Sequence, residues 1–406
     1  MIILNSRAQR TSYPADLSAI MNIAQAHQSR LWLAPWAGIS RGATPLHDLP
    51  DLAQRLNVAR VSVKDESVRS SLGSFKALGA PIALVRQILR LHPDFEPTAI
   101  LAGRYANDLR DYTVISATDG NHGRGLAAAA RDAGCQCVIV LHANVSQERE
   151  QAIAIYGARI VRIAGNYDES VQEAARLAAV NEWQVISDTS YDGYEEIPRD
   201  VMQGYGTIAE EIIEQTGCHP GEAGAFTHVF LQGGVGGMAA GLASYFWEYH
   251  GTQRPCFVVV EPAQADCLLQ SAIEGRPSKA TGSVDSVMAG LACGETSPLA
   301  WRFLQPSVDA FLTIEDEQAL EAMRVLAEGS VRDIPIVAGE SGVAGLAALD
   351  LLRSNPQLSQ KVGLTAESCV LIISTEGATA PSEYALRVGE SADEVLQRQL
   401  SWKAAR

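Results

Sequence analysis

Short apolar runs rich in valine and isoleucine alternate along the chain with longer segments that have a helical spacing of apolar residues. The apolar runs occupy residues 59–66, 112–120, 135–141, 158–165, 183–190, 227–234, 256–262 and 369–375. Since these runs lack strict alternation of apolar and polar residues, they are predicted to be strands buried on both faces. Residues 121–134, 167–182 and 237–251 are predicted helices, and Gly134 and Gly251 stand where helix C-caps belong.

The order of these elements predicts an α/β protein. Alternation of strands and helices is typical of open, mostly parallel sheets with helices on both faces. A chain of 406 residues exceeds one ordinary hydrophobic core, so two domains are expected. We predict a smaller α/β domain over residues 66–190 and a larger one built from residues 1–65 and 191–406. Ligands of such sheets bind at the carboxyl ends of the strands, and the candidate chemistry is therefore expected there.

Composition narrows the classes of partner. The net charge of -15 argues against a nucleic-acid partner, which needs a basic face, and against binding to an anionic membrane. No apolar run reaches the length of a membrane span, and the N-terminal residues "MIILNSRAQR" lack the pattern of a signal peptide. We therefore expect a cytoplasmic protein with a small-molecule substrate. The seven cysteines match no zinc spacing, so no metal site is predicted.

Lys76 stands in the segment "GSFKALGA", residues 73–80, which is predicted to begin a helix. The partial positive charge of a helix N-terminus disfavours an ammonium group there. Either Lys76 extends into solvent, as most lysines do, or its nitrogen is desolvated and uncharged, as Schiff-base chemistry requires. Lys64 and Glu66, at the end of the run at 59–66, are expected to be surface or structural charges.

The first notable strand end is the turn before the helix predicted at 121–134. Its residues are Thr118, Asp119, Gly120, Asn121 and His122. Exposed backbone N–H groups at such a turn can bind a carboxylate or a phosphate, although the same letters are also typical of an ordinary turn. Thr118, Gly120 and His122 are candidate substrate-binding residues.

Two further strand ends lie in the second half of the chain. A glycine-rich loop ends the run at 227–234, and its residues are Gly233, Gly234, Val235, Gly236 and Gly237. Glycine is needed where backbone amides must approach phosphate oxygens closely. Ser374 and Thr375 follow the last buried run and are candidate cofactor contacts.

The glycine-rich loop by itself also fits a dinucleotide site. Gly234, Gly236 and Ala239 have the spacing of the dinucleotide fingerprint, and Glu261 at the end of the next run could bind a ribose hydroxyl. An NAD-dependent oxidoreductase is therefore an alternative on the evidence of this unit alone.

Lys76 in "GSFKALGA", Asn121 in "DGNHG", the loop "GGVGG" and the Ser374-Thr375 turn follow one another in this order. The ordered set resembles the fold-type II pyridoxal-phosphate enzymes, the group of tryptophan synthase β and threonine dehydratase. The resemblance implies two tryptophan synthase β-like domains, a homodimer and bound pyridoxal 5'-phosphate. It implies that Lys76 holds the aldehyde of the cofactor, residues 233–237 its phosphate and Asn121 its 3-oxygen. Ser374, or Thr375 beside it, is then the partner of the pyridine nitrogen.

Five segments resemble a narrower group within that family, the diaminopropionate ammonia-lyases. They are "ATDGNHGRG", "SDTSYDGYEEIP", "VVVEPAQADC", "VMAGLACGE" and "STEGAT". The resemblance implies a carbon–nitrogen lyase that converts 2,3-diaminopropionate to pyruvate and two ammonia molecules, with Asp119 and Asp188 as catalytic acids and bases. Carboxylates suit this substrate because they hold a second ammonium group, at Cβ, better than hydroxyls do. Asp119 stands where many family members carry serine or threonine.

Other interpretations stay open at this point. One is a pyridoxal-phosphate dehydratase of serine, threonine or 3-hydroxyaspartate, and another is a binding protein that keeps the fold without the chemistry. Asp119 could be only a turn former and Asp188 only a helix cap. Cys267 and Cys293 are expected to come close enough to pair, although disulfides are unusual in the cytoplasm.

Overall fold

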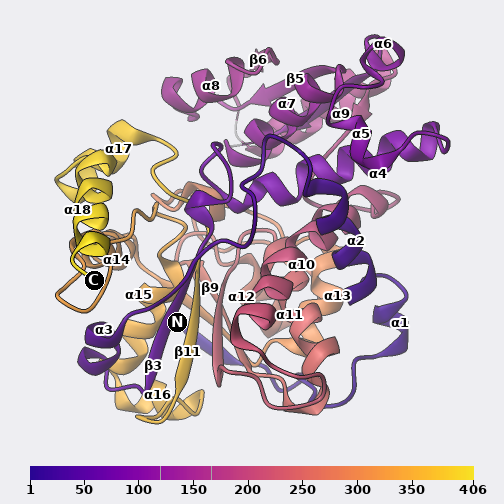
Figure 1. The fold of residues 1–406 in the computed structure, drawn as a ribbon. Helices are drawn as coiled ribbons and strands as arrows, with labels where there is room; N and C mark the ends of the chain where they lie inside the picture. Colours follow the sequence, from indigo (N-terminus) through magenta and orange to yellow (C-terminus); the bar gives the residue numbers. More distant parts are fainter. Residues whose placement is uncertain (119, 166) are drawn as a thin grey trace. The chain divides into compact units, whose positions relative to one another are not determined.

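The computed structural model describes residues 1–118, 120–165 and 167–406. These residues form two compact units, each of which is described by itself. The larger unit comprises Met1–Ile23, Ala43–Val68 and Ile208–Arg406, and the smaller unit comprises Ala24–Gly42 and Arg69–Thr207. Figure 1 shows the course of the chain through their helices and strands.

The larger unit contains a seven-stranded sheet in the order β1-β10-β9-β8-β11-β3-β2. The strands are β1 (Ile2–Leu4), β2 (Leu46–Asp48), β3 (Arg60–Asp65), β8 (His228–Gln232), β9 (Cys256–Pro262), β10 (Ala310–Ile314) and β11 (Cys369–Ser374). The five central strands run parallel, and the short edge strands β1 and β2 are antiparallel to their neighbours. The central strands are buried on both faces, which explains their continuous valine- and isoleucine-rich runs.

Helices cover both faces of this sheet, with α11 and α13 on one side and α14 to α16 on the other (Figure 1). The helices are α1 (Ala15–Ser18), α3 (Pro50–Arg55), α11 (Gly237–His250), α12 (Cys267–Glu274), α13 (Pro298–Ser307), α14 (Asp316–Glu328), α15 (Ala344–Arg353), α16 (Pro356–Lys361), α17 (Pro381–Val388) and α18 (Ala392–Ala404). Short 3₁₀ helices span Glu66–Val68 (η1), Gly251–Gln253 (η3) and Ala289–Leu291 (η4). One core joins strand residues such as Val63 and Phe230 to Met323 of α14 and Leu349 of α15.

The smaller unit contains a parallel sheet in the order β6-β5-β4-β7. Its strands are β4 (Thr113–Ala117), β5 (Gln136–Leu141), β6 (Arg159–Arg162) and β7 (Gln184–Val185). Its helices are α2 (Ile23–Leu33), whose first residue belongs to the larger unit, η2 (Phe75–Leu78), α4 (Ala80–Leu91), α5 (Pro97–Ile100), α6 (Ala106–Leu109), α7 (Asn121–Ala133), α8 (Gln147–Ala154) and α9 (Tyr167–Asn181). Helix α10 (Glu196–Thr216) begins in the smaller unit and ends in the larger one.

The α/β class with two mostly parallel sheets is confirmed, and all eight predicted strands are present. The sequence pattern missed β1, β2 and β10. Strands β1 and β2 have three residues each, which is too short for a pattern to be recognised. Gly134 adopts a left-handed conformation with φ +89° and ends α7, as predicted.

The boundaries between the units differ from those predicted from the sequence. Residues 24–42 and 191–207 lie in the smaller unit, not with the larger one. Arg86 of α4 donates to the carbonyl oxygen of Gln25 and to Ser29 Oγ, and these contacts attach α2 to the smaller unit. Arg90 of α4 pairs in the same way with Asp200 at the start of α10. Such long-range contacts leave no local pattern in the sequence. Within the described residues, no helix combines the length and the apolar character needed to cross a membrane.

Candidate active site

In the smaller unit, Lys76 lies in the short helix η2, directly before α4. Its Nζ donates to Asp188 Oδ2 at 2.5 Å, and the two side chains are only 19% and 15% exposed. The rings of Phe75 and Tyr205 lie 5.2 and 5.8 Å from Nζ, measured to their centroids. Lys76 therefore does not extend into solvent, and a carboxylate compensates its charge at the helix start.

Asp188 is held as an ionised carboxylate. Burial by itself raises the pKa of its carboxyl group, but the ammonium of Lys76, which also donates a hydrogen bond to it, outweighs burial and holds that pKa well below its usual range. The next helix begins at Glu196, so Asp188 does not cap a helix. Tyr194 stabilises the segment before Asp188, because its hydroxyl donates to the carbonyl oxygen of Val185 and accepts from the N–H of Ser187.

His122 is buried beside this pair. Its Nε2 lies 2.9 Å from the carbonyl oxygen of Ile186, which can only accept, so Nε2 carries the proton. Its Nδ1 lies 3.7 Å from Asp188 Oδ2. Burial lowers the pKa of the imidazole, which keeps His122 neutral at pH 7 with the Nδ1 lone pair free to accept a proton.

The turn before α7 is held by Thr118. Its Oγ1 accepts from the N–H groups of Gly120 and Gly123, at 3.1 and 3.2 Å, so this hydroxyl stabilises the turn. Gly120 has φ +157°, a conformation that side chains rarely adopt. Asn121 is the first residue of α7. Asp119 lies outside the described residues, and its role stays a prediction.

Three small residues that sequence analysis did not single out let helices approach Lys76 closely. A Cβ atom on Gly125 of α7 would lie 3.2 Å from the carbonyl oxygen of Lys76. A Cβ atom on Gly204 of α10 would lie 2.1 Å from the carbonyl oxygen of Leu78, and one on Gly79 would lie 2.6 Å from Tyr205. For Gly125 and Gly204, a glycine inside a helical pattern was the available signal, because it destabilises a helix unless close packing requires it.

In the larger unit, the glycine-rich loop joins β8 to α11. Gly233 donates its N–H to the carbonyl oxygen of Val260 and so ends the strand ladder. Gly236 has φ +101°, and a Cβ atom there would lie 2.8 Å from Leu304 Cδ1, so only glycine fits. Among the described residues, no group accepts from the N–H groups of residues 234–237. These donors stand at the N-terminus of a 14-residue helix and suit an anion such as a phosphate.

Ser374 ends β11, the strand beside β8. The register pairs Ile372 with Phe230, which sets Ser374 level with Gln232, immediately before the glycine-rich loop. Ser374 is fully buried, and its Oγ has no hydrogen-bond partner in the described part of the chain. An unpaired buried hydroxyl costs about 1–3 kcal/mol, so a ligand atom is its natural partner. Thr375, the next residue, is also buried. The loop and the hydroxyl together fit a ligand with an anionic group and a further hydrogen-bonding atom.

Glu261 is not available to bind a ribose. It is fully buried at the end of β9, and its two carboxylate oxygens accept from the N–H groups of Leu268 and Leu269, each at 2.7 Å. The carboxylate therefore holds the N-terminus of α12, and burial raises its pKa well above the usual range. This structural role removes the acidic residue on which the dinucleotide interpretation depended.

Of the two alternatives expected for Lys64 and Glu66, the structural one holds, because both side chains are buried. Lys64 is fully buried, and its Nζ donates to Glu211 Oε2 and to the carbonyl oxygen of Thr44, each at 2.7 Å. Thr44 Oγ1 donates to Glu66 Oε1 at 2.6 Å. The network is buried because α10 packs over the end of β3, which the strand pattern alone does not reveal.

No disulfide joins Cys267 and Cys293. Cys267 Sγ donates to the carbonyl oxygen of Gly234 at 3.5 Å, and a Cβ atom on Gly234 would lie 3.2 Å from Cys293 Sγ. Both sulfur atoms therefore lie against the same glycine of the loop, which agrees with the expectation that they come close, but no disulfide forms between them. Among the described residues, no group of three or more histidine, cysteine, aspartate or glutamate side chains could hold a metal ion.

Comparison with known proteins connects these features. The sequence model of the family described as "Pyridoxal-phosphate dependent enzyme" matches residues 39–375. The diaminopropionate ammonia-lyase of Escherichia coli (strain K12) is 37% identical over 384 residues, which cover 93% of this chain and 94% of the relative. The Salmonella typhimurium (strain LT2) protein of the same name is 38% identical over 351 residues, covering 84% and 86%. The crystal structure of the Escherichia coli enzyme in complex with an aminoacrylate-PLP azomethine reaction intermediate has a TM-score of 0.84 at 35% identity, and the match covers 96% of each chain.

Proposed function

The chain belongs to the family of pyridoxal-phosphate dependent enzymes, and we propose that it converts 2,3-diaminopropionate and water to pyruvate and two molecules of ammonia. The observation that carries this proposal is the ion pair between Lys76 and Asp188. It sets an ionised carboxylate at the lysine that the family uses to hold its cofactor. A carboxylate favours a substrate with a second ammonium group over one with a hydroxyl group.

Candidate cofactor contacts were identified in each of the two units. We propose that Lys76 holds its aldehyde carbon and Asn121 its 3-oxygen. The N–H groups of residues 234–237 bind the phosphate, and the unpaired Oγ of Ser374 meets the pyridine nitrogen. When bound, pyridoxal phosphate withdraws electrons from Cα of the substrate and so makes the Cα proton removable.

The chemistry of the chain itself is proton transfer. Asp188, held ionised, accepts the Cα proton on one side of the substrate or holds the Cβ ammonium group. We assign the same task on the opposite side to Asp119, so that either enantiomer of the substrate serves. His122 keeps its Nδ1 lone pair toward Asp188 and can take up the proton that Asp188 accepts. Thr118 and Gly120 shape the turn that faces the substrate carboxylate.

A substrate panel tests the reaction. The purified holoenzyme is assayed for keto acid and ammonia together on D- and L-2,3-diaminopropionate, L-serine, L-threonine and 3-hydroxyaspartate. We expect the highest kcat/KM on diaminopropionate, with two ammonia molecules released for each pyruvate. A higher kcat/KM on a hydroxy-amino acid, with one ammonia molecule for each keto acid, would support the dehydratase alternative instead.

The Asp119→Ser variant distinguishes elimination of ammonia from diaminopropionate from dehydration of a hydroxy-amino acid in the same protein. The variant should retain the cofactor, because Lys76, Ser374 and the glycine-rich loop are unchanged. Its rate on diaminopropionate should fall by roughly 10²–10⁴-fold, the usual scale for a lost acid–base group, and more for one enantiomer than for the other. Its rate on serine should fall much less. An equal loss of rate on both enantiomers of diaminopropionate and on serine would mean that Asp119 only shapes the turn.

We further propose that the protein acts as a homodimer in the cytoplasm, as the resemblance to its family implies. Size-exclusion chromatography with light scattering measures the mass in solution, and fractionation of the native cells locates the protein. A monomeric holoenzyme with full activity would contradict the dimer.

A further inference from the structure

A pocket of about 220 Å³ lies in the larger unit, between α3 and the C-terminal end of α14. Its apolar surface comes from the buried side chains of Leu52, Leu326 and Ile334. Pockets for drug-sized ligands measure roughly 300–1,000 Å³, so this one suits a smaller molecule. None of its residues belongs to the candidate active site.

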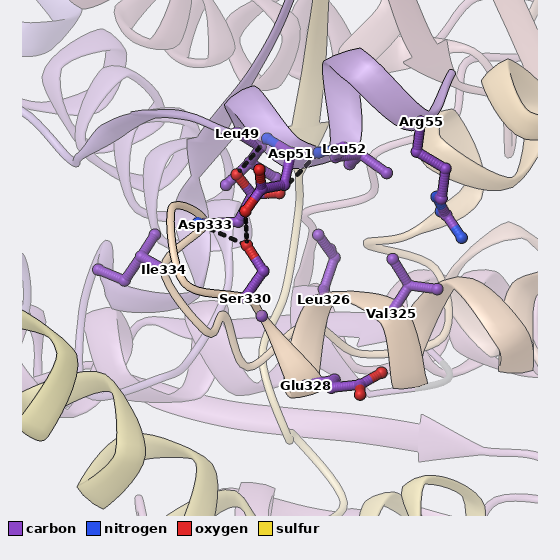
Figure 2. A pocket seen from close by; sticks show the side chains of 11 residues that line it. Leu49, Asp51, Leu52, Arg55, Val325, Leu326, Glu328, Ser330, Asp333 and Ile334 are labelled. Atoms are coloured by element: carbon purple, nitrogen blue, oxygen red, sulfur yellow. Dashed lines mark hydrogen bonds between the residues drawn. The ribbon is translucent and has the colours of Figure 1, made fainter. Parts of the chain in front are cut away.

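The frame of the pocket is held by hydrogen bonds and does not depend on a ligand. Asp333 accepts from the N–H groups of Asp51 and Leu52, each at 2.8 Å, and so caps the start of α3. Asp51 accepts from Ser330 Oγ at 2.5 Å and pairs with Arg332. Figure 2 shows Asp333 and Ser330 joined on one side of the pocket. Because these two aspartates already have donors, they are not free to bind a ligand cation.

Two other charged side chains of the lining are still available. Arg55 makes only a loose contact with Asp350, at 3.9 Å, and both side chains are about half exposed. Within the described part of the chain, neither the Arg55 nor the Glu328 side chain makes a hydrogen bond, although the charge of Glu328 lies near Arg398. Figure 2 shows Arg55 above and Glu328 below the side chains of Val325 and Leu326. The pocket therefore offers one cation, one anion and an apolar surface.

We propose that this pocket binds a zwitterionic α-amino acid with an aliphatic side chain. The planar guanidinium of Arg55 matches a carboxylate in a two-bond geometry, and the carboxylate of Glu328 accepts from an ammonium group. The aliphatic side chain covers the apolar surface formed by Leu52, Val325 and Leu326. The site is independent of the proposed reaction and carries no chemistry of its own.

Binding of L-leucine to the holoenzyme tests the proposal. Saturation-transfer NMR detects the ligand, and the thermal midpoint of the holoenzyme should rise with its concentration. Two leucine analogues separate the contributions of the two charged groups to binding, because 4-methylpentanoate lacks the ammonium group and 3-methylbutylamine lacks the carboxylate. We expect each analogue to bind at least about tenfold more weakly than L-leucine, because each loses one charge-assisted hydrogen-bonding group.

Two variants test which charged group of L-leucine each side chain binds. Arg55→Ala should weaken L-leucine by at least about tenfold and leave 3-methylbutylamine unchanged, whereas Glu328→Gln should weaken L-leucine and leave 4-methylpentanoate unchanged. Arg276→Ala and Glu321→Gln alter exposed charges outside the pocket lining and should bind L-leucine as the parent protein does.

Absence of L-leucine binding, or equal binding by all the variants, would overturn the assignment. The absorbance of the bound cofactor distinguishes the pocket from the active site. It should stay unchanged while the pocket fills. A change in that absorbance that persists in Arg55→Ala, with the same concentration dependence as the NMR signal, would place L-leucine at the cofactor and refute the proposal.

Discussion

Replacing Asp188 by asparagine removes the carboxylate that accepts from Lys76 and keeps the size of the side chain. In the cofactor-free protein, the lysine ammonium then loses the counter-charge of Asp188 while the rings of Phe75 and Tyr205 still lie beside it. A partly desolvated ammonium without a counter-charge gives up its proton more readily. The neutral amine is the form that attacks an aldehyde, so covalent attachment of pyridoxal phosphate to Lys76 should become faster.

The geometry of the pair sets the size of the effect. Two unit charges about 4 Å apart at an effective dielectric constant near 20 attract each other by roughly 4 kcal/mol. The 19% and 15% exposure of the two side chains lets water reduce that value, to about 1–3 kcal/mol. At pH 7, the rate of attachment should therefore rise by roughly 5- to 150-fold. Turnover of one enantiomer of diaminopropionate should fall by roughly 10²–10⁴-fold, because the proton acceptor is gone.

Attachment is followed by the absorbance of the bound cofactor, and borohydride trapping with peptide mass spectrometry assigns it to Lys76. Asp192→Asn, in the same loop but exposed, is the matched control and should change neither rate. If attachment to the Asp188→Asn protein slows while turnover is lost, the carboxylate assists attachment and does not hold the lysine proton. Unchanged turnover of both enantiomers would remove Asp188 from the mechanism.

Three further substitutions test the neighbouring parts of the structure. Ser374→Ala should leave the cofactor-free protein as stable as the parent or slightly more stable, because it removes an unpaired buried hydroxyl, but it should weaken cofactor retention. Thermal unfolding of the cofactor-free and cofactor-bound proteins separates these two effects. An equal loss of stability in both forms would contradict the assignment of Ser374 to the cofactor. Burial raises the pKa of Asp65 from 3.8 to about 6, so its ionisation opposes folding as the pH rises through this window. The parent protein should lose about 3 kcal/mol of stability between pH 3.8 and 6 that Asp65→Asn does not lose, as urea unfolding of cofactor-free protein at several pH values can show. Gly204→Ala adds a Cβ atom 2.1 Å from the carbonyl oxygen of Leu78. This contact should destabilise the protein by about 1–3 kcal/mol and slow cofactor attachment at Lys76. An unchanged unfolding midpoint would show that α10 can move away from Leu78.

The local sequence determined most of the strands, the principal helices and the glycine-rich loop. Burial of a parallel strand on both faces requires a continuous apolar run, and such runs marked every central strand of both sheets except β10. The loop at 233–237 was recognisable because a strand, a glycine turn and a helix N-terminus follow one another directly. Lys76, Asn121 and Ser374 were recognisable only as members of an ordered set that resembles one enzyme family.

Only the tertiary structure decided which charges are paired. Lys76 and Asp188 are 112 residues apart and meet through the packing of the smaller unit. Glu261 fits a dinucleotide fingerprint by its position in the sequence, but in the fold it caps α12. Lys64 likewise ends a strand that could face solvent, and the docking of α10 buries it. Periodicity and turn chemistry report on contacts a few residues apart, whereas the ionisation and role of a carboxylate or lysine depend on groups that distant segments bring together.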